Sequence, residues 1–447
     1  NPPPHAPVLG PQERTLERVH ADLLPAWVID QSRVHQTGDS AAAEASFETL
    51  VDALGEDFPE GAELIGELRD LVVEDDALTE HPQDILGAVR TWNKFMDRIE
   101  QPWWLDGNIM ATPASVFFYT KSYKILGDVQ VSVDTRDYRT RFVARADRTN
   151  IRESFLGHTS PDQDGAIILA DRLYDFTTRD LWPLMDPSLD EGRDGRMSAY
   201  ADLVRAEVHA GISAESAALL QRTASERQSI LDVLDAVRGR RSCGSTFVIT
   251  ELPWNGLPSD EYKLIEQYAH RDRFDKCPAI RKEEAERLIT SSEALKDLGP
   301  ELERAVGELV AHAARAVSVH EARHADDHAQ ANGFKEPLSC APCDKVNLPR
   351  ASRAELSAYL ASFAHESTGY TALFQACAII DDGNTPHAIA MRVFSRRFDE
   401  DICRGAPPPE HLKQRAEALE LEFFERSHSI TLPSNFPSSL ELYMRAD

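Results

Sequence analysis

The feature that most constrains this chain is a single long helix predicted between Pro300 and Gly333. Proline is favoured in the first turn of a helix, and glycine is common just past the last turn. Between them, apolar residues recur in steps of three and four, which places their side chains on one helix face. They are Leu302, Val306, Leu309, Ala313 and Val317. A helix with such a face needs a protein core to cover it.

The same steps, continued along the helix, reach His320, His324 and Asp327. Polar groups on a buried face cost several kcal/mol unless they have partners, such as a metal ion and the groups around it. Residues four apart rise about 6 Å along one face, so two imidazoles can reach one ion. The pattern therefore favours metal-binding histidines over the alternative, solvated histidines on a helix surface.

Glu321 directly follows the first histidine and completes a His-Glu-x-x-His motif. A motif this short also occurs by chance in some chains. Its side chain is offset by about 100° from that of His320, where a carboxylate can take a proton from water on the ion. Asp327 is predicted to contact a histidine ligand and fix the orientation of its ring without binding the metal itself. A plain surface carboxylate is the alternative for Asp327.

A catalytic zinc site needs a third protein ligand and an open position for water. The segment Ser352–His365 has a strongly helical pattern, and its Glu355 is our predicted third ligand. Ser352 and Glu355 also fit a Ser-x-x-Glu capping box, in which the glutamate would face the start of its own helix. Both interpretations remain open at this point.

The pattern His320-Glu321-x-x-His324-x-x-Asp327, followed by Glu355 near the start of a helix, resembles the gluzincin peptidases. Within that clan it is most similar to the catalytic domains of anthrax lethal factor-like toxins. The resemblance covers only residues 317–366. It implies a zincin-like catalytic domain with one zinc ion, bound by the two histidines and Glu355, and with Glu321 as the general base.

The resemblance also implies a peptide bound along an edge strand, for which residues 246–251 are the candidate. The resemblance does not indicate which residue donates the hydrogen bond that stabilises the oxyanion. Many gluzincins have an acid four residues after the glutamate ligand, where this chain has Tyr359, and no tyrosine precedes Glu355 as in the toxin-like enzymes. Tyr359, His365 and Tyr370 are the candidates, and we predict a catalytic role for His365 or Tyr359.

We predict an α+β, mainly helical protein with a small antiparallel sheet. The expected regions are a Pro-rich lead (1–10), a helical N-terminal region (11–100), a β-rich region (101–190) and a mainly helical, zincin-like metallopeptidase region (191–447, motif core 300–380). Helices are expected at 12–29, 41–54, 84–99 and 197–237. Strands are expected at 115–126, 128–133, 138–144 and 165–173.

Length, composition and charge limit the classes of partner. With 447 residues and 42% apolar composition, the chain can bury a large core in two or three domains. Its formal net charge of −27 disfavours nucleic acid and anionic membranes as partners. No apolar run approaches the roughly 18 residues that a membrane span requires.

Six cysteines, all in the second half, suit up to three disulfides in an oxidising compartment, with free thiols or a structural zinc site as alternatives.

The start, Asn1-Pro2-Pro3-Pro4, is typical of a processed N-terminus. Arginine outnumbers lysine, a bias of GC-rich bacterial genomes. We therefore expect an extracytoplasmic bacterial protein that is secreted, periplasmic or at the cell surface.

The predicted activity is zinc-dependent hydrolysis of peptide bonds in a protein or peptide substrate. Zinc would polarise the scissile carbonyl, and Glu321 would move a proton from water to the leaving amine. One alternative is a catalytically inactive zincin-like envelope or binding protein. Another is a metal-dependent amidohydrolase acting on a non-peptide substrate. A pro-segment or a partner protein with a regulatory role is compatible with either class.

Overall fold

The computed structural model describes residues 10–440, except 75–76, 112–115, 148–154, 160–164, 193–200, 244–258, 272–276, 332–337, 399–401 and 404–411. The chain forms two compact units. Unit 1 comprises Asn1–Asp128 and Arg141–Phe155, and unit 2 comprises Val129–Thr140 and Leu156–Asp447. The protein is mainly helical with one sheet, as the predicted α+β class requires. The β-rich region is divided between the two units instead of standing alone.

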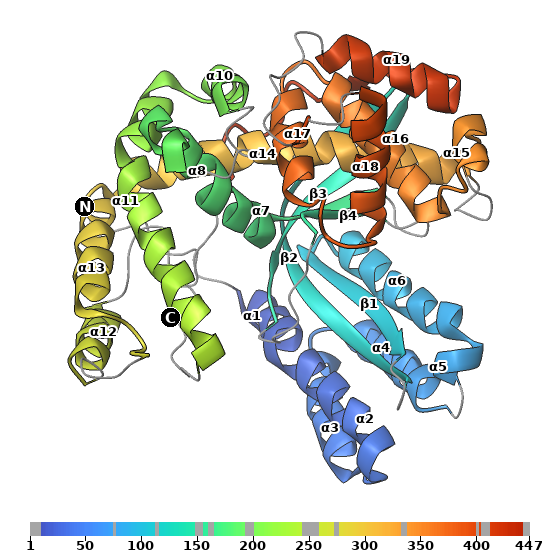
Figure 1. Ribbon diagram of the computed structural model, residues 1–447. Helices are drawn as coiled ribbons and strands as arrows, with labels where there is room; N and C mark the ends of the chain where they lie inside the picture. Colours follow the sequence, from blue (N-terminus) through green and yellow to red (C-terminus); the bar gives the residue numbers. More distant parts are fainter. Residues whose placement is uncertain are drawn as a thin grey trace. The chain divides into compact units, whose positions relative to one another are not determined.

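Helices make up most of unit 1, as predicted for residues 11–100 (Figure 1). They are α1 (Pro11–Arg18), the π-helical turn η1 (Val19–Leu23), α2 (Leu24–Thr37), α3 (Ala41–Gly55), α4 (Pro59–Val73), α5 (Ala77–Glu80) and α6 (Pro82–Arg98). Pro59 and Pro82 occupy first turns, where a missing backbone N–H costs nothing. The helix predicted to end at residue 29 continues to Gly38, whose φ of 72° provides a left-handed C-cap.

Strand β1 (Trp103–Ala111) pairs antiparallel with the first part of β2 (Val116–Val133), in a register that matches Trp103 with Lys124. The sequence patterns did not predict β1. The core of unit 1 includes the buried aromatic residues Trp27, Trp92 and Trp103. Helix α6 packs against β1, where the buried Asn93 side chain accepts from the Leu105 amide and donates to its carbonyl, both at 2.8 Å.

A histidine lies within this core. His20, in η1, is fully buried, and its ring stacks on Trp103 with 4.7 Å between centroids. Neither ring nitrogen has a hydrogen-bond partner among the described residues. Burial lowers the pKa of His20 to about 3, although the charge of Asp147 acts in the opposite direction. His20 is therefore neutral in folded unit 1 at ordinary pH.

We predict that His20→Phe reduces the acid sensitivity of the fold. The pKa of His20 is lower in the folded state than the ordinary 6.5. The contribution of neutral His20 to the free energy of unfolding is therefore fully present above pH 6.5 and is lost as the pH falls toward 3. The slope approaches about 1.4 kcal/mol per pH unit. Urea denaturation at pH 7 and pH 4.5 measures it, with the exposed His81→Gln as a control. Equal acid losses in wild type and His20→Phe would contradict the prediction.

The sheet is curled and mixed, which corrects the predicted antiparallel sheet. Its order is β1-β2-β3-β5-β4, with β6 beside β2; the new strands are β3 (Arg136–Arg145), β4 (Gly157–Thr159), β5 (Ala166–Leu169) and β6 (Ile430–Thr431). The strands predicted at 115–126 and 128–133 form one strand, β2. The strand predicted to reach residue 173 ends at Leu169, because Ala170 and Leu173 then become buried at helical spacing in α7.

Unit 2 contains most of the helices. They are α7 (Ala170–Phe176), η2 (Thr177–Leu181), α8 (Trp182–Leu184), η3 (Pro187–Gly192), α10 (Ala201–Gly211), α11 (Ala214–Gly239), η4 (Arg240–Cys243), α12 (Ser259–Arg271), α13 (Lys282–Lys296), α14 (Gly299–Gln330), α15 (Ala341–Lys345), α16 (Arg350–Ala364), α17 (Gly369–Ala378), α18 (Pro386–Phe398) and α19 (Leu412–Phe424). The helix predicted at 197–237 is interrupted at Ser213, whose hydroxyl caps α11. The candidate edge strand at 246–251 lies outside the described residues.

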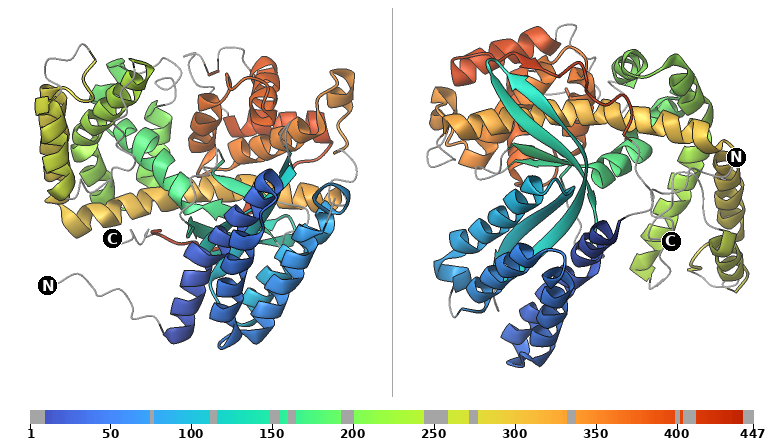
Figure 2. Two further views of the ribbon diagram at one scale, coloured as in Figure 1. Left: turned by 90° about the horizontal axis from the view of Figure 1, so that it is seen from below. Right: turned by 180° about the vertical axis from the view of Figure 1, so that it is seen from behind.

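Helix α14 is the long helix predicted from the sequence (Figure 2). It packs against α16 near one end and α11 near the other. Its apolar stripe from Leu302 to Val317 is at most 4% exposed. Residues around the whole circumference are buried between Leu309 and His328, so the helix is covered on all sides there. It ends at Gln330, and the predicted stop at Gly333 lies outside the described residues.

The six cysteines lie in three pairs at disulfide distance, all in unit 2: Cys243–Cys277, Cys340–Cys343 and Cys377–Cys403. Their Cα atoms are 6.5, 5.1 and 5.3 Å apart, within the range that a disulfide spans. This agrees with the disulfide interpretation of the sequence and not with free thiols. Across the described ranges, no helix has both the length and the apolar composition needed to cross a membrane.

Candidate metal centre

Three predicted metal ligands converge in unit 2. The Nε2 atoms of His320 and His324 are 3.1 Å apart, and Oε2 of Glu355 lies 3.3 Å from the first and 3.4 Å from the second. In a tetrahedral zinc site with bonds of about 2.0–2.1 Å, ligand atoms are about 3.3 Å apart. The three atoms therefore already have the spacing of one face of a zinc tetrahedron.

The start of α16 decides between the two interpretations of Glu355. The helix begins at Arg350, with Pro349 as its N-cap, so Ser352 lies inside the first turn and cannot cap it. Glu355 is in the second turn and faces the two histidines of α14. The capping-box alternative is therefore wrong.

The electrostatics of the cluster suit a cation. Burial would raise the pKa of Glu355, but the charge of His324 and hydrogen bonds from His320 and His324 hold it well below its usual value. Burial also opposes a charge on His324, yet the Glu355 carboxylate outweighs burial and raises the pKa of His324 to about 9. Burial lowers the pKa of His320. A metal ion would displace the proton of His324, so its affinity must weaken as pH falls.

The kinds of side chain that converge here suit zinc. Two imidazoles and one carboxylate are a common combination in catalytic zinc sites that keep a position for water. Among the described residues, His320, His324 and Glu355 are the one group whose ligand atoms all lie within 4.8 Å of one another. The side chains are only 10–15% exposed, so an ion there would be largely shielded from bulk water.

His387 is a member of the site that the sequence patterns did not reveal. Its Nδ1 lies 2.8 Å from Oε2 of Glu355 and 3.1 Å from the Tyr359 hydroxyl. Its ring centroid is 6.5 Å from that of His320, and it does not belong to the converging ligand group. Pro386 marks the start of α18 in the sequence, but nothing local could show that this helix reaches Glu355.

Tyr359 is at the site, as predicted. It follows Glu355 by one helical turn, and its ring centroid lies 4.8 Å from that of His320. Burial, followed by the charges of Glu355 and Glu321, raises the pKa of Tyr359 well above its ordinary value, so the hydroxyl remains a donor.

His365, the other predicted donor, lies ten residues after Glu355, about 15 Å farther along the helix axis. Its Nδ1 is 2.9 Å from the Thr368 hydroxyl and 3.4 Å from that of Ser367. Tyr370 donates its backbone N–H to Glu207. The structure therefore brings Tyr359, and not His365, to the three predicted metal ligands.

Glu321 lies beside the ligands, on the side of strand β4. It is 5% exposed, and the hydroxyl of Thr159 donates to its Oε2 at 2.7 Å. Its negative charge favours the charged forms of His320 and His324, which indicates that the carboxylate is near both. A base that acts on water at a bound metal ion would need such a position.

Asp327 contacts arginines. Its Oδ1 lies 3.1 Å from Nε of Arg323 and 3.6 Å from a terminal nitrogen of Arg426. A terminal nitrogen of Arg323 is 3.4 Å from Oε1 of Glu420 in α19. Asp327 is thus part of a buried ion cluster, and its charge favours the protonated form of His324.

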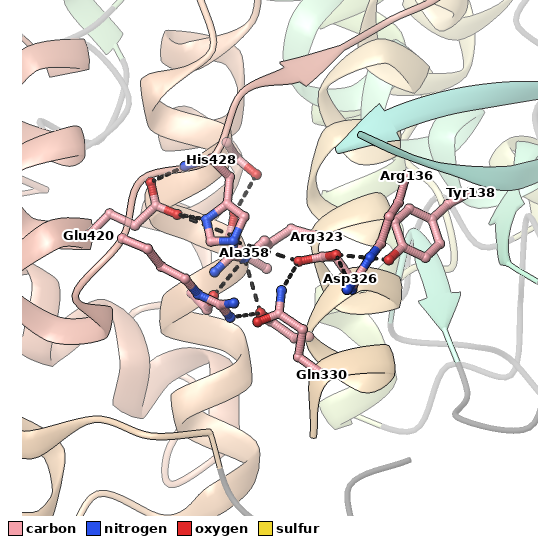
Figure 3. Close-up of polar contacts among 12 residues, drawn as sticks. Arg136, Tyr138, Arg323, Asp326, Gln330, Ala358, Glu420 and His428 are labelled. Atoms are coloured by element: carbon pink, nitrogen blue, oxygen red, sulfur yellow. Dashed lines mark hydrogen bonds and ion pairs between the residues drawn. The ribbon is translucent and has the colours of Figure 1, made fainter. Parts of the chain in front are cut away.

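This cluster continues into the C-terminal segment (Figure 3). His428 hydrogen-bonds Oε1 of Glu420 at 2.7 Å, and its other ring nitrogen lies 3.6 Å from Oδ2 of Asp326. Tyr138 of β3 donates to Oδ1 of Asp326 at 2.8 Å, and Gln330 also donates to Asp326. The polar residues at the end of α14 therefore connect a strand, a second helix and the segment after it.

Comparisons with protein-family models, with curated proteins and with solved structures give no match. The likeness to gluzincins consequently rests on the motif residues and on the arrangement of this site. These are two different observations, because the position of Glu355 relative to the histidines is a property of the fold and not of the motif.

We predict that Glu355→Gln lowers the zinc content of the purified protein well below one ion per chain. The amide has no negative charge to offset the ion and binds it weakly. His387→Ala is the matched control, since His387 contacts Glu355 without converging on the ligand group, and it should retain the metal. Elemental analysis after dialysis measures both. A full zinc complement in Glu355→Gln would exclude Glu355 as a ligand.

We also predict that Arg323→Met strongly destabilises the chain. The substitution leaves the carboxylates of Asp327 and Glu420 buried without their guanidinium partner, a change that typically costs about 3–5 kcal/mol. Arg304→Met, at an exposed ion pair on the same helix, should cost less than about 1 kcal/mol. Guanidinium denaturation followed by circular dichroism compares them, and similar midpoints would show that the buried cluster adds no stability.

Proposed function

We propose that this protein is a zinc-dependent peptidase with a gluzincin-like site. The observation that carries the proposal is the convergence of His320, His324 and Glu355 to within 3.4 Å, with the Glu321 carboxylate beside them. A structural zinc site is usually closed by four protein ligands. Here three ligand atoms converge, and Tyr359 and His387, which can donate hydrogen bonds, lie beside them.

Bound zinc would supply a Lewis acid that polarises a carbonyl group and lowers the pKa of water. The residues of the chain provide the proton transfers and the orientation. Glu321 accepts a proton from the attacking water and delivers it to the leaving amine. Tyr359, with its raised pKa, and His387 are the donors that we propose for the developing oxyanion. In this proposal they have the donor role that the sequence analysis also considered for His365.

The substrate that we propose is an extended protein or peptide segment. Among the described strands, β4 is last in the strand order, and it lies against α14, where Thr159 contacts Glu321. An extended peptide can add itself to a free strand edge through main-chain hydrogen bonds. With a net charge of −27, the chain favours neutral or basic substrates over acidic ones.

An extracytoplasmic location agrees with the three cysteine pairs, because disulfides persist in oxidising compartments. We therefore propose a bacterial protein that acts in the periplasm, at the cell surface or outside the cell. The disulfides Cys340–Cys343 and Cys377–Cys403 lie before α16 and around α18, the helices that carry Glu355 and His387. Oxidation would thus support the elements that form the site.

We predict that Glu321→Gln retains zinc but loses peptide hydrolysis by at least about 100-fold, the scale of general-base catalysis. Glutamine keeps the shape and the hydrogen bond from Thr159 but cannot accept the proton. Zinc analysis and cleavage of an unfolded, fluorescently labelled protein test the two parts. Undiminished hydrolysis would refute the role of Glu321.

The same two assays on the wild-type protein distinguish the peptidase from the two alternative functions, an inactive binding protein and an amidohydrolase. Stoichiometric zinc without cleavage of any unfolded protein would favour a binding protein with an inactive site. Hydrolysis of small non-peptide amides alone would favour an amidohydrolase. Cleavage that depends on zinc and on Glu321 would establish the peptidase.

A further inference from the structure

Strand β4 contacts the carboxylate of Glu321 through two of its residues. The Thr159 hydroxyl lies 2.7 Å from Oε2 of Glu321 and 3.2 Å from the Glu321 backbone oxygen. A hydroxyl has only one proton to donate, and a charged acceptor makes the stronger bond. The proton therefore goes to Oε2, which leaves Oε1 without this donor.

Gly157, two residues earlier, makes room for the same carboxylate. A Cβ atom at position 157 would lie 2.6 Å from Cγ, 2.7 Å from Oε1 and 2.9 Å from Cδ of Glu321, closer than side chains can pack. Alternate residues of a strand share one face, so Gly157 and Thr159 both face α14. The pairing of β4 with β5 fixes this face, since Gly157 is opposite Ile168 and Thr159 is opposite Ala166.

We propose that Thr159 is a positioning residue for the general base, acting together with the space at Gly157. Thr159 fixes Oε2 while Oε1 lies over Gly157, so the carboxylate is held in one orientation for the proton transfer that Glu321 performs. The terminal torsion of glutamate is broad, so a carboxylate without such a partner samples many orientations. This inference rests on the proposed function of Glu321 but names a residue outside the motif.

The test compares Thr159→Val with wild type. Valine keeps the branched shape and removes the donor, so kcat should fall about 10- to 100-fold, as expected for a displaced reacting group, while KM and zinc content stay constant. Thr159→Ser, which restores the hydroxyl, should recover most of kcat. Thr140→Val in β3 is the control, because the buried Thr140 hydroxyl has no hydrogen-bond partner among the described residues. It should leave kcat unchanged.

A second readout requires no substrate. Cobalt(II) replaces zinc in the purified protein, and its visible absorption spectrum responds to groups that contact its water ligand. The spectrum of Thr159→Val should move away from that of wild type in the same direction as that of Glu321→Gln. The Thr159→Ser and Thr140→Val spectra should match wild type.

The two readouts separate the possible failures. If wild type binds the metal but cleaves no peptide, the proposed function fails, and the cobalt spectra alone decide whether Thr159 positions Glu321. If wild type is active and Thr159→Val keeps wild-type kcat, the inference about Thr159 is wrong and the peptidase stands. A loss of zinc or of folding cooperativity in Thr159→Val that serine also fails to correct would assign Thr159 a structural role instead, which overturns the inference.

Discussion

A buried guanidinium group is the constraint on which unit 2 depends. Arg323 has no exposed surface, so its charge must be compensated within the protein, and Asp327 and Glu420 do so from its own helix and from α19. Desolvating such a charge without partners would cost more than the fold can supply. The chain can therefore bury α14 only if α19 and the segment after it are in place. Arg323 also donates to the hydroxyl of Ser357 at 2.8 Å, so the same side chain contacts α16, the helix that carries Glu355.

Two charged groups lie on neighbouring turns of α14. Arg323 and Asp327 join the buried ion cluster with Glu420 and Arg426. His320 and His324 meet the Glu355 carboxylate, which raises the pKa of His324 against the effect of burial. A metal ion bound by this second group would replace the proton of His324.

The sequence could predict what is periodic and local. The stripe on α14 and the helical pattern around Glu355 selected three residues whose donor atoms converge in the structure, because helical geometry determines which residues share a face. His387 and Thr159 could not be found in this way, since they reach the site through a separate helix and a three-residue strand. His365 shows the opposite error. It looked suitable by residue type, but ten residues of helix carry it away from Glu355.

The pairing of β6 with β2 has a consequence for the order in which unit 2 can assemble. Ser132 pairs with Thr431, and His428 contacts Glu420 and Asp326, so segments far apart in the sequence must meet beside the end of α14. Contacts between such distant segments require the closure of a long loop, and its entropy cost slows their formation. We therefore expect the ion cluster at the end of α14 to form late in the folding of unit 2.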